Sequence, residues 1–126
     1  MASSESKLRK LAIVPAYNEG GMVGRVVRDI HREAPGFDVL VVDDGSTDTT
    51  AIEAQAQGAL VIRHPYNLGI GGAVQSGFTY ALENGYQRLV QVDGDGQHDP
   101  GEIAKLESVM DEDRYMVRRW NEFIAA

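Results

Sequence analysis

The chain has 126 residues and a formal net charge of −7, from 12 basic and 19 acidic side chains. This length and charge indicate one small acidic domain and exclude a strongly basic nucleic-acid-binding protein. The chain has no cysteine, which excludes disulfides, thiolate zinc sites and a cysteine nucleophile.

Four short β-branched runs bounded by proline, glycine or aspartate predict four strands. They are residues 11–14, 37–42, 59–62 and 89–92. Between the runs lie stretches with apolar residues at helical spacing, which begin near Met22, Ala51 and Ala73. This alternation predicts an α/β fold, with a mostly parallel sheet of about four strands flanked by helices.

Two segments carry helix-start signals. Asp99, Pro100 and Glu102 supply a capping acid, a proline at the first helical position and an acid three residues after the cap. Ser46 and Asp48 offer side-chain oxygens that can cap the first amides of a helix after the second strand. We therefore expect helices to begin just after both segments.

Polar residues follow every predicted strand. The four strand ends are residues 15–19, 43–48, 63–67 and 93–98. Ligands of open parallel sheets bind beyond the carboxyl ends of the strands, where loops and helix N-termini converge. We therefore expect a ligand site where these four segments meet.

Asp93 and Asp95 are the sharpest feature of the sequence, because one glycine separates them on the last of these loops. Two carboxylates at this spacing can both face a hard divalent cation whose remaining ligands are phosphate oxygens and water. The alternative is an acidic turn that caps the next helix. The loop does not fit a calcium-binding EF-hand, which needs glycine at the position of His98 and glutamate at that of Ala104.

The glycines of two other loops suggest further ligand contacts. Gly20 and Gly21 imitate part of a dinucleotide-binding fingerprint, but Glu19 occupies the place of its first glycine. A dinucleotide-dependent oxidoreductase is therefore the weakest of the functions considered. Gly69 and Gly71 permit close approach of a ligand at the start of the third helix.

Four ordered motifs between Lys10 and Leu106 resemble family 2 glycosyltransferases. The motifs are Val14-Pro-Ala-Tyr-Asn-Glu19, Val41-Val-Asp-Asp-Gly-Ser-Thr-Asp48, Asn67-Leu-Gly-Ile-Gly-Gly-Ala73 and Val92-Asp-Gly-Asp-Gly-Gln-His-Asp-Pro100. The resemblance is to the polyprenyl-phosphate sugar transferases akin to dolichyl-phosphate mannose synthase. It implies the GT-A fold, a Rossmann-like nucleotide-binding core.

The resemblance also implies the donor, the cofactor and the site residues. The donor is a nucleotide-diphosphate sugar, UDP- or GDP-linked, and the acceptor is a polyprenyl phosphate at the membrane surface, with inversion at the sugar. Asp93 and Asp95 have the catalytic role and, with Gln97, hold Mg²⁺ or Mn²⁺. The implied nucleotide-binding residues are Pro15, Ala16, Tyr17, Glu19, Asp43, Asp44 and Gly71. Because members of this family are considerably longer, a truncated module that binds nucleotide sugar without catalysis is the alternative.

The two ends of the chain lie outside this resemblance. We divide the chain into a polar segment (1–10), the core (11–106) and a helical tail (107–126) that matches no motif of the family. An apolar face in the tail is expected to cover sheet surface, either within the chain or in a homo-oligomer; it consists of Met116, Trp120, Phe123 and Ile124. With a polar start and no apolar stretch approaching the roughly 18 residues of a membrane span, we expect a cytoplasmic protein, at most peripheral to the membrane.

Overall fold

The computed structural model describes residues 8–96, 101–103, 105 and 107. The elements in chain order are β1 (Lys10–Ala16), α2 (Val23–Glu33), β2 (Phe37–Asp43), α3 (Thr50–Ala56), β3 (Leu60–Arg63), α4 (Ile70–Glu83) and β4 (Arg88–Gln91). All strand pairs are parallel, and the order across the sheet is β3-β2-β1-β4. The predicted α/β fold with a parallel sheet is therefore confirmed.

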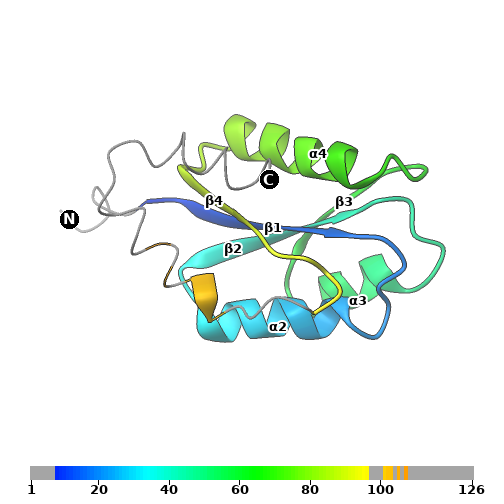
Figure 1. The fold of residues 1–126 in the computed structure, drawn as a ribbon, viewed down its shortest axis with the longest axis horizontal. Coiled ribbons are helices and arrows are strands. Elements are labelled where there is room, and N and C mark those ends of the chain that lie inside the picture. Colours follow the sequence, from blue (N-terminus) through cyan, green and yellow to red (C-terminus); the bar gives the residue numbers. More distant parts are fainter. Residues whose placement is uncertain (1–7, 97–100, 104, 106, 108–126) are drawn as a thin grey trace.

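Two helical layers enclose the sheet, with α4 on one face and α2 and α3 on the other (Figure 1). The alternation of side chains along β1 explains this arrangement. Leu11 and Ile13 are buried in the cluster that includes Ala73 of α4. Ala12 and Val14 are buried in the cluster on the α2 side. A strand covered on both faces reads as a continuous apolar run, which is why β1 was recognisable in the sequence.

The chain changes direction across the sheet at β1. From β1 it proceeds through β2 to β3 on one side, and β4 then pairs on the other side of β1. β2 pairs with β1 up to Ala16, whereas the pairing of β4 with β1 ends at Ile13. The loops that leave β1 and β4 therefore diverge at the carboxyl edge, and such a switch point is where parallel sheets bind ligands.

The structure describes one of the two predicted helix starts fully and the other in part. Asp48 Oδ1 accepts a hydrogen bond from the N–H of Thr50 at 3.0 Å, at the start of α3. Ser46 does not cap this helix, because its Oγ accepts the N–H of Asn18 across the sheet edge instead. After β4, residues 102, 103, 105 and 107 are helical as predicted, while Asp99 and Pro100 lie outside the described residues.

Only Glu107 of the predicted tail is among the described residues. Residues 108–126, with the expected apolar face, are outside the described part of the chain. Within the described ranges, no helix has both the length and the apolar character needed to cross a membrane.

Candidate functional site

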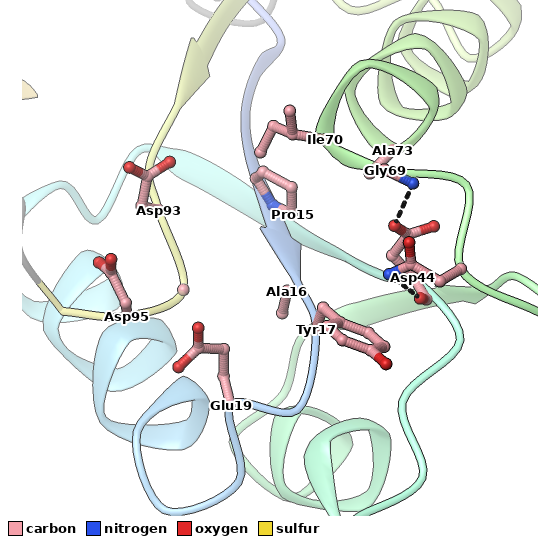
Figure 2. A pocket seen from close by; sticks show the side chains of 12 residues that line it. Pro15, Ala16, Tyr17, Glu19, Asp44, Gly69, Ile70, Ala73, Asp93 and Asp95 are labelled. Carbon is pink, nitrogen blue, oxygen red and sulfur yellow. Dashed lines mark hydrogen bonds between the residues drawn. The ribbon is translucent and has the colours of Figure 1, made fainter.

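A cavity of about 390 Å³ opens at the carboxyl edge of the sheet, at the switch point between β1 and β4. All four strand ends contribute to it (Figure 2). The lining residues are Pro15, Ala16, Tyr17, Glu19, Asp44, Asn67, Gly69, Ile70, Ala73, Asp93, Gly94 and Asp95. The convergence expected from the sequence is thus present in the folded chain.

Most of the residues singled out from the sequence meet in this cavity. Those that line it are Pro15, Ala16, Tyr17, Glu19, Asp44, Asp93 and Asp95. Gly71 lies one residue beyond the lining residue Ile70, exposed in the first turn of α4. Gln97 is outside the described residues.

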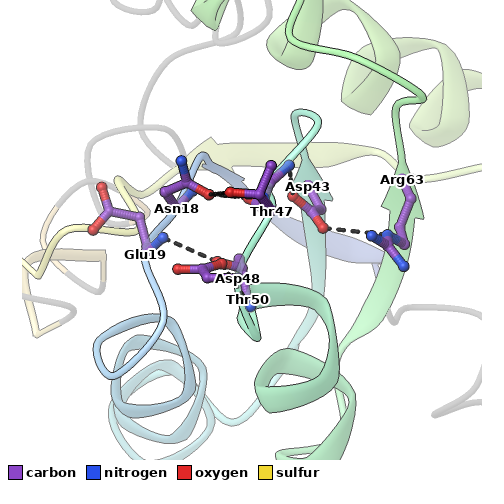
Figure 3. A network of polar contacts seen from close by, with 8 residues as sticks. Asn18, Glu19, Asp43, Thr47, Asp48, Thr50 and Arg63 are labelled. Atoms are coloured by element: carbon purple, nitrogen blue, oxygen red, sulfur yellow. Dashed lines mark hydrogen bonds and ion pairs between the residues drawn. The ribbon is translucent and has the colours of Figure 1, made fainter.

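Asp43 is not part of the cavity lining, although it precedes Asp44. Its side chain is 1% exposed, and its Oδ1 accepts the N–H of Ser46 at 3.0 Å. Its Oδ2 lies 3.4 Å from Nε of Arg63 on β3 (Figure 3). Asp43 therefore holds the turn after β2 from inside the sheet, and Asp44 is the acid that reaches the cavity.

Three carboxylates form one end of the cavity. Glu19, Asp93 and Asp95 lie toward one side of Pro15 and Ala16, and Asp44 lies on the other side (Figure 2). The pKa of Glu19 is raised, first by desolvation and then by the negative charges of Asp95, Asp48 and Asp93. This end of the cavity therefore favours positive charge.

Gly94 brings the two aspartates of this end close to β1. A Cβ atom at Gly94 would lie 3.1 Å from Cβ of Ala16 and 3.2 Å from the carbonyl oxygen of Pro15. A larger residue would push the loop away from β1, so the glycine between Asp93 and Asp95 has a packing reason.

The acidic end has the donor chemistry of a site for a hard cation. Asp93 and Asp95 are both partly buried on one loop, and carboxylate oxygens are ligands that Mg²⁺ and Mn²⁺ prefer. Among the described residues, no group of three or more His, Cys, Asp or Glu side chains is arranged to hold a metal ion by itself.

Asp44 forms the other end of the cavity and is held by the loop between β3 and α4. Its Oδ1 lies 2.7 Å from Nδ1 of His64 and accepts the N–H of Leu68 at 2.9 Å. Its Oδ2 accepts the N–H of Gly69 at 2.8 Å. Burial opposes ionisation of Asp44, but the hydrogen bonds from His64, Leu68 and Gly69 together lower its pKa.

His64 lies in the third strand end, residues 63–67, which was expected to reach the site, whereas Ser76 was not among the predicted residues. Nε2 of His64 lies 2.7 Å from Oγ of Ser76 on α4, so the hydrogen-bonded chain runs from Asp44 through His64 to Ser76. The only signal in the sequence was the place of His64 directly after the third strand. Asn67, Ile70 and Ala73 also line the cavity without having been singled out as site residues, and they too follow the third strand.

The loop between β1 and α2 does not offer a phosphate site. Its backbone amides are occupied by side chains from the segment after β2 (Figure 3). The N–H of Glu19 donates to Thr50 Oγ1 at 3.0 Å, that of Gly20 to Asp48 Oδ2 at 3.0 Å, and that of Gly21 to Glu53 Oε1 at 2.7 Å. A dinucleotide fingerprint needs these amides free for a pyrophosphate, so the oxidoreductase alternative loses its structural basis.

Replacing Glu19 by glutamine is expected to raise the thermal midpoint of the metal-free protein slightly at neutral pH. Because its pKa is raised above 4.5 in the folded protein, the ionised side chain destabilises the fold above that folded pKa. This effect disappears once the pH falls below about 4.5. Thermal unfolding of the parent and the variant between pH 4 and pH 8 measures this difference in midpoint. A lower midpoint for the variant at pH 8 would show that ionised Glu19 does not destabilise the fold.

The chain is therefore a parallel α/β domain with a candidate ligand site at the carboxyl edge of its sheet. Asp44 lies at one end of this site, and Glu19, Asp93 and Asp95 lie at the other. The family model described as "Glycosyl transferase family 2" matches residues 11–122. The chain belongs to this family.

Two relatives and one solved structure show the extent of the similarity. The chain is 36% identical over 109 residues to polyprenol monophosphomannose synthase of Mycolicibacterium smegmatis, covering 82% of this chain and 41% of that protein. It is 38% identical over 104 residues to undecaprenyl-phosphate mannosyltransferase of Micrococcus luteus, covering 79% and 43%. Glucosyl-3-phosphoglycerate synthase of Mycobacterium tuberculosis, solved with Mn²⁺, UDP and glucosyl-3-phosphoglycerate, superposes with a TM-score of 0.67, 24% identity and coverage of 84% and 40%. The chain thus spans about two fifths of the length of these proteins.

Proposed function

We propose that this domain binds a nucleotide-diphosphate sugar together with a divalent cation and forms the donor-binding part of a glycosyltransferase. The observation that carries the proposal is the polarity of one cavity, with Asp44 at one end and Glu19, Asp93 and Asp95 at the other. A nucleotide sugar matches both ends. Its base donates hydrogen bonds, which Asp44 can accept, and its diphosphate needs a cation, which the three carboxylates of the other end can bind. Both curated relatives named above are sugar transferases that act on polyprenyl phosphates.

Asp93, Asp95 and Gln97 are the residues that we assign to Mg²⁺ or Mn²⁺. When bound, the cation neutralises the diphosphate and stabilises the charge of the departing nucleoside diphosphate. The two aspartates would hold the cation in the cavity between β1 and β4. The blocked amides after β1 support this assignment, since the backbone of that loop cannot neutralise a diphosphate in the cation's place.

Pro15, Ala16, Tyr17 and Asp44 are the residues that we assign to the base and ribose, and Glu19, which belongs to the acidic end, follows Tyr17 on the same loop. Asp44 is ionised and accepts hydrogen bonds, which suits a ring or exocyclic N–H of the base. Two of the residues expected to bind nucleotide have indirect roles in this proposal. Asp43 acts by holding the Ser46 amide, and Gly71 leaves the first turn of α4 unobstructed.

The acceptor in this proposal is a polyprenyl phosphate, and transfer inverts the sugar. A phosphate oxygen is already ionised near neutral pH, so the domain needs no strong general base for attack. The relatives' remaining three fifths are expected to supply acceptor contacts. The competing possibility is a binding module without turnover, and product formation from a sugar donor and polyprenyl phosphate separates the two.

Replacing Asp95 by asparagine tests the cation assignment. We expect UDP binding in the presence of Mn²⁺ to weaken by at least about tenfold, because one anionic ligand is lost. UDP binding without Mn²⁺ should stay within about twofold, because the lost ligand acts through the metal. The metal-free thermal midpoint should barely change, since asparagine keeps the shape of aspartate at this partly buried position. Titration calorimetry with and without Mn²⁺ measures both.

Glu83→Gln is the matched control, because Glu83 is an exposed acid at the end of α4 that does not line the cavity. Equal Mn²⁺-dependent affinity of the Asp95→Asn variant and the parent protein would refute the assignment of Asp95.

A further inference from the structure

The hydrogen-bonding capacity of Asp44 is nearly used up within the protein. An ionised carboxylate has about four acceptor positions, two on each oxygen. Among the residues that the structure describes, Oδ1 interacts with both His64 and Leu68, whereas Oδ2 accepts only the N–H of Gly69. One position therefore remains, on Oδ2, and Asp44 lines the cavity with its side chain 5% exposed.

The tautomer of His64 follows from its neighbours. Because an ionised carboxylate only accepts hydrogen bonds, Nδ1 of His64 carries the proton shared with Asp44. In the neutral ring Nε2 then accepts from the hydroxyl of Ser76, 2.7 Å away. Asp44 thus selects the tautomer, and the hydrogen bond between Ser76 and Nε2 holds the ring in the orientation that donates to Asp44.

We propose that His64, oriented by Ser76, is a positioning residue that occupies Oδ1 of Asp44 and thereby makes the site selective for uracil over guanine. The inference rests on the proposed nucleotide-binding function. Uracil presents one ring N–H, flanked by carbonyl groups, and needs one acceptor. Guanine presents an adjacent ring N–H and amino group, which pair with both oxygens of a carboxylate, and Oδ1 has no position left for the second of these.

Two substitutions of His64 separate donation to Asp44 from contact with Ser76. The amide nitrogen of asparagine is as close to the backbone as Nδ1, whereas that of glutamine reaches as far as Nε2. His64→Asn therefore keeps a donor for Asp44, and His64→Gln removes it. Ser76→Ala keeps the ring but removes the hydrogen bond that orients it.

The test is titration calorimetry of the full chain with UMP and GMP in the absence of metal, which isolates the base end from the acidic end. The parent should bind UMP at least about tenfold more tightly than GMP, the effect of one hydrogen bond to a charged group. His64→Gln frees a position on Oδ1, so it should lose this preference because GMP binding tightens about tenfold while UMP binding changes by less than about threefold. His64→Asn should stay within about threefold of the parent for both nucleotides. Ser76→Ala should fall between them. His31→Gln, on α2 and remote from the cavity lining, is the control and should not change either affinity.

Two results would overturn the inference while leaving the proposed function intact. One is a parent protein that binds GMP as tightly as UMP. The other is a His64→Gln variant with the parent's affinities and a lower thermal midpoint, which would assign His64 a structural role alone. A parent protein that binds neither nucleotide, with or without Mn²⁺, would instead contradict the proposed function and this inference with it.

Discussion

Replacing Asp44 by alanine is expected to lower the free energy of unfolding by about 3 kcal/mol, because buried donors lose a charged acceptor. The N–H groups of Leu68 and Gly69 and the Nδ1–H of His64 all donate to this carboxylate. They lie on the segment that joins β3 to α4, so the substitution releases one wall of the cavity. Denaturant unfolding measures the loss.

Asp38→Ala is the control for this experiment. Asp38 lies on β2, the strand that precedes Asp44, but is exposed, and its Oδ2 accepts a hydrogen bond from the hydroxyl of Tyr86 at 2.6 Å. Its removal should cost less than about 1 kcal/mol, as for most surface groups. Similar losses for the two variants would show that the contacts of Asp44 do not hold the loop.

The contribution of Asp44 to stability should depend on pH. Its pKa lies below the ordinary value of 3.8, because the hydrogen bonds outweigh the effect of burial. A lowered pKa in the folded state means that the contribution is complete above about pH 4 and is lost as the pH falls through the folded pKa. The difference in unfolding free energy between the parent and Asp44→Asn should therefore be constant near neutral pH and shrink below about pH 4.

Asp44 should also contribute to binding of the nucleoside. Because Asp44 is assigned to the base, Asp44→Asn should weaken binding of the nucleoside alone, and not only of the diphosphate. Calorimetry with uridine and UDP distinguishes the two. A loss confined to UDP would move Asp44 from the base to the phosphate end of the site.

Replacing Gly45 by alanine is the second substitution with a large expected effect, about 3 kcal/mol or more, since it combines backbone strain with a collision. Gly45 has φ +80°, a conformation that residues with a Cβ atom rarely adopt. That Cβ atom would lie 2.5 Å from the backbone nitrogen of Asn67 and 2.5 Å from the carbonyl carbon of Tyr66. The turn after β2 and the loop after β3 therefore cross at a distance that only glycine permits.

Gly58→Ala separates strain from collision. Gly58 has φ +88°, but its nearest atom would be Cε1 of His31 at 3.6 Å, which is ordinary contact. It should lose only about 1 kcal/mol, the strain alone. Thermal and denaturant unfolding of both variants measure the difference, and equal losses would show that the crossing of the two loops relaxes at little cost.

Much of the fold could be read from the sequence because its signals are local. The run 11–14 was recognisable as a strand since β1 is buried on both faces, and the alternation of strands with helical stretches then implied a parallel sheet. The rule that parallel sheets bind ligands beyond their carboxyl ends brought Asp44, Asp93 and Asp95 into one predicted site without any contact being known.

What only the tertiary structure decided are the partners of those acids. Asp43 and Asp44 are adjacent and chemically identical, but successive side chains point in opposite directions, so one holds a turn and the other lines the cavity. Gly20 and Gly21 imitate part of a dinucleotide-binding fingerprint in the sequence, but in the folded chain their amides donate to Asp48 and Glu53. His64 contacts Asp44 across 20 positions of sequence, and Ser76 contacts His64 across 12. Hydrophobic periodicity specifies which elements form, whereas polar contacts of this kind depend on where the crossovers place distant loops, and no local pattern encodes that.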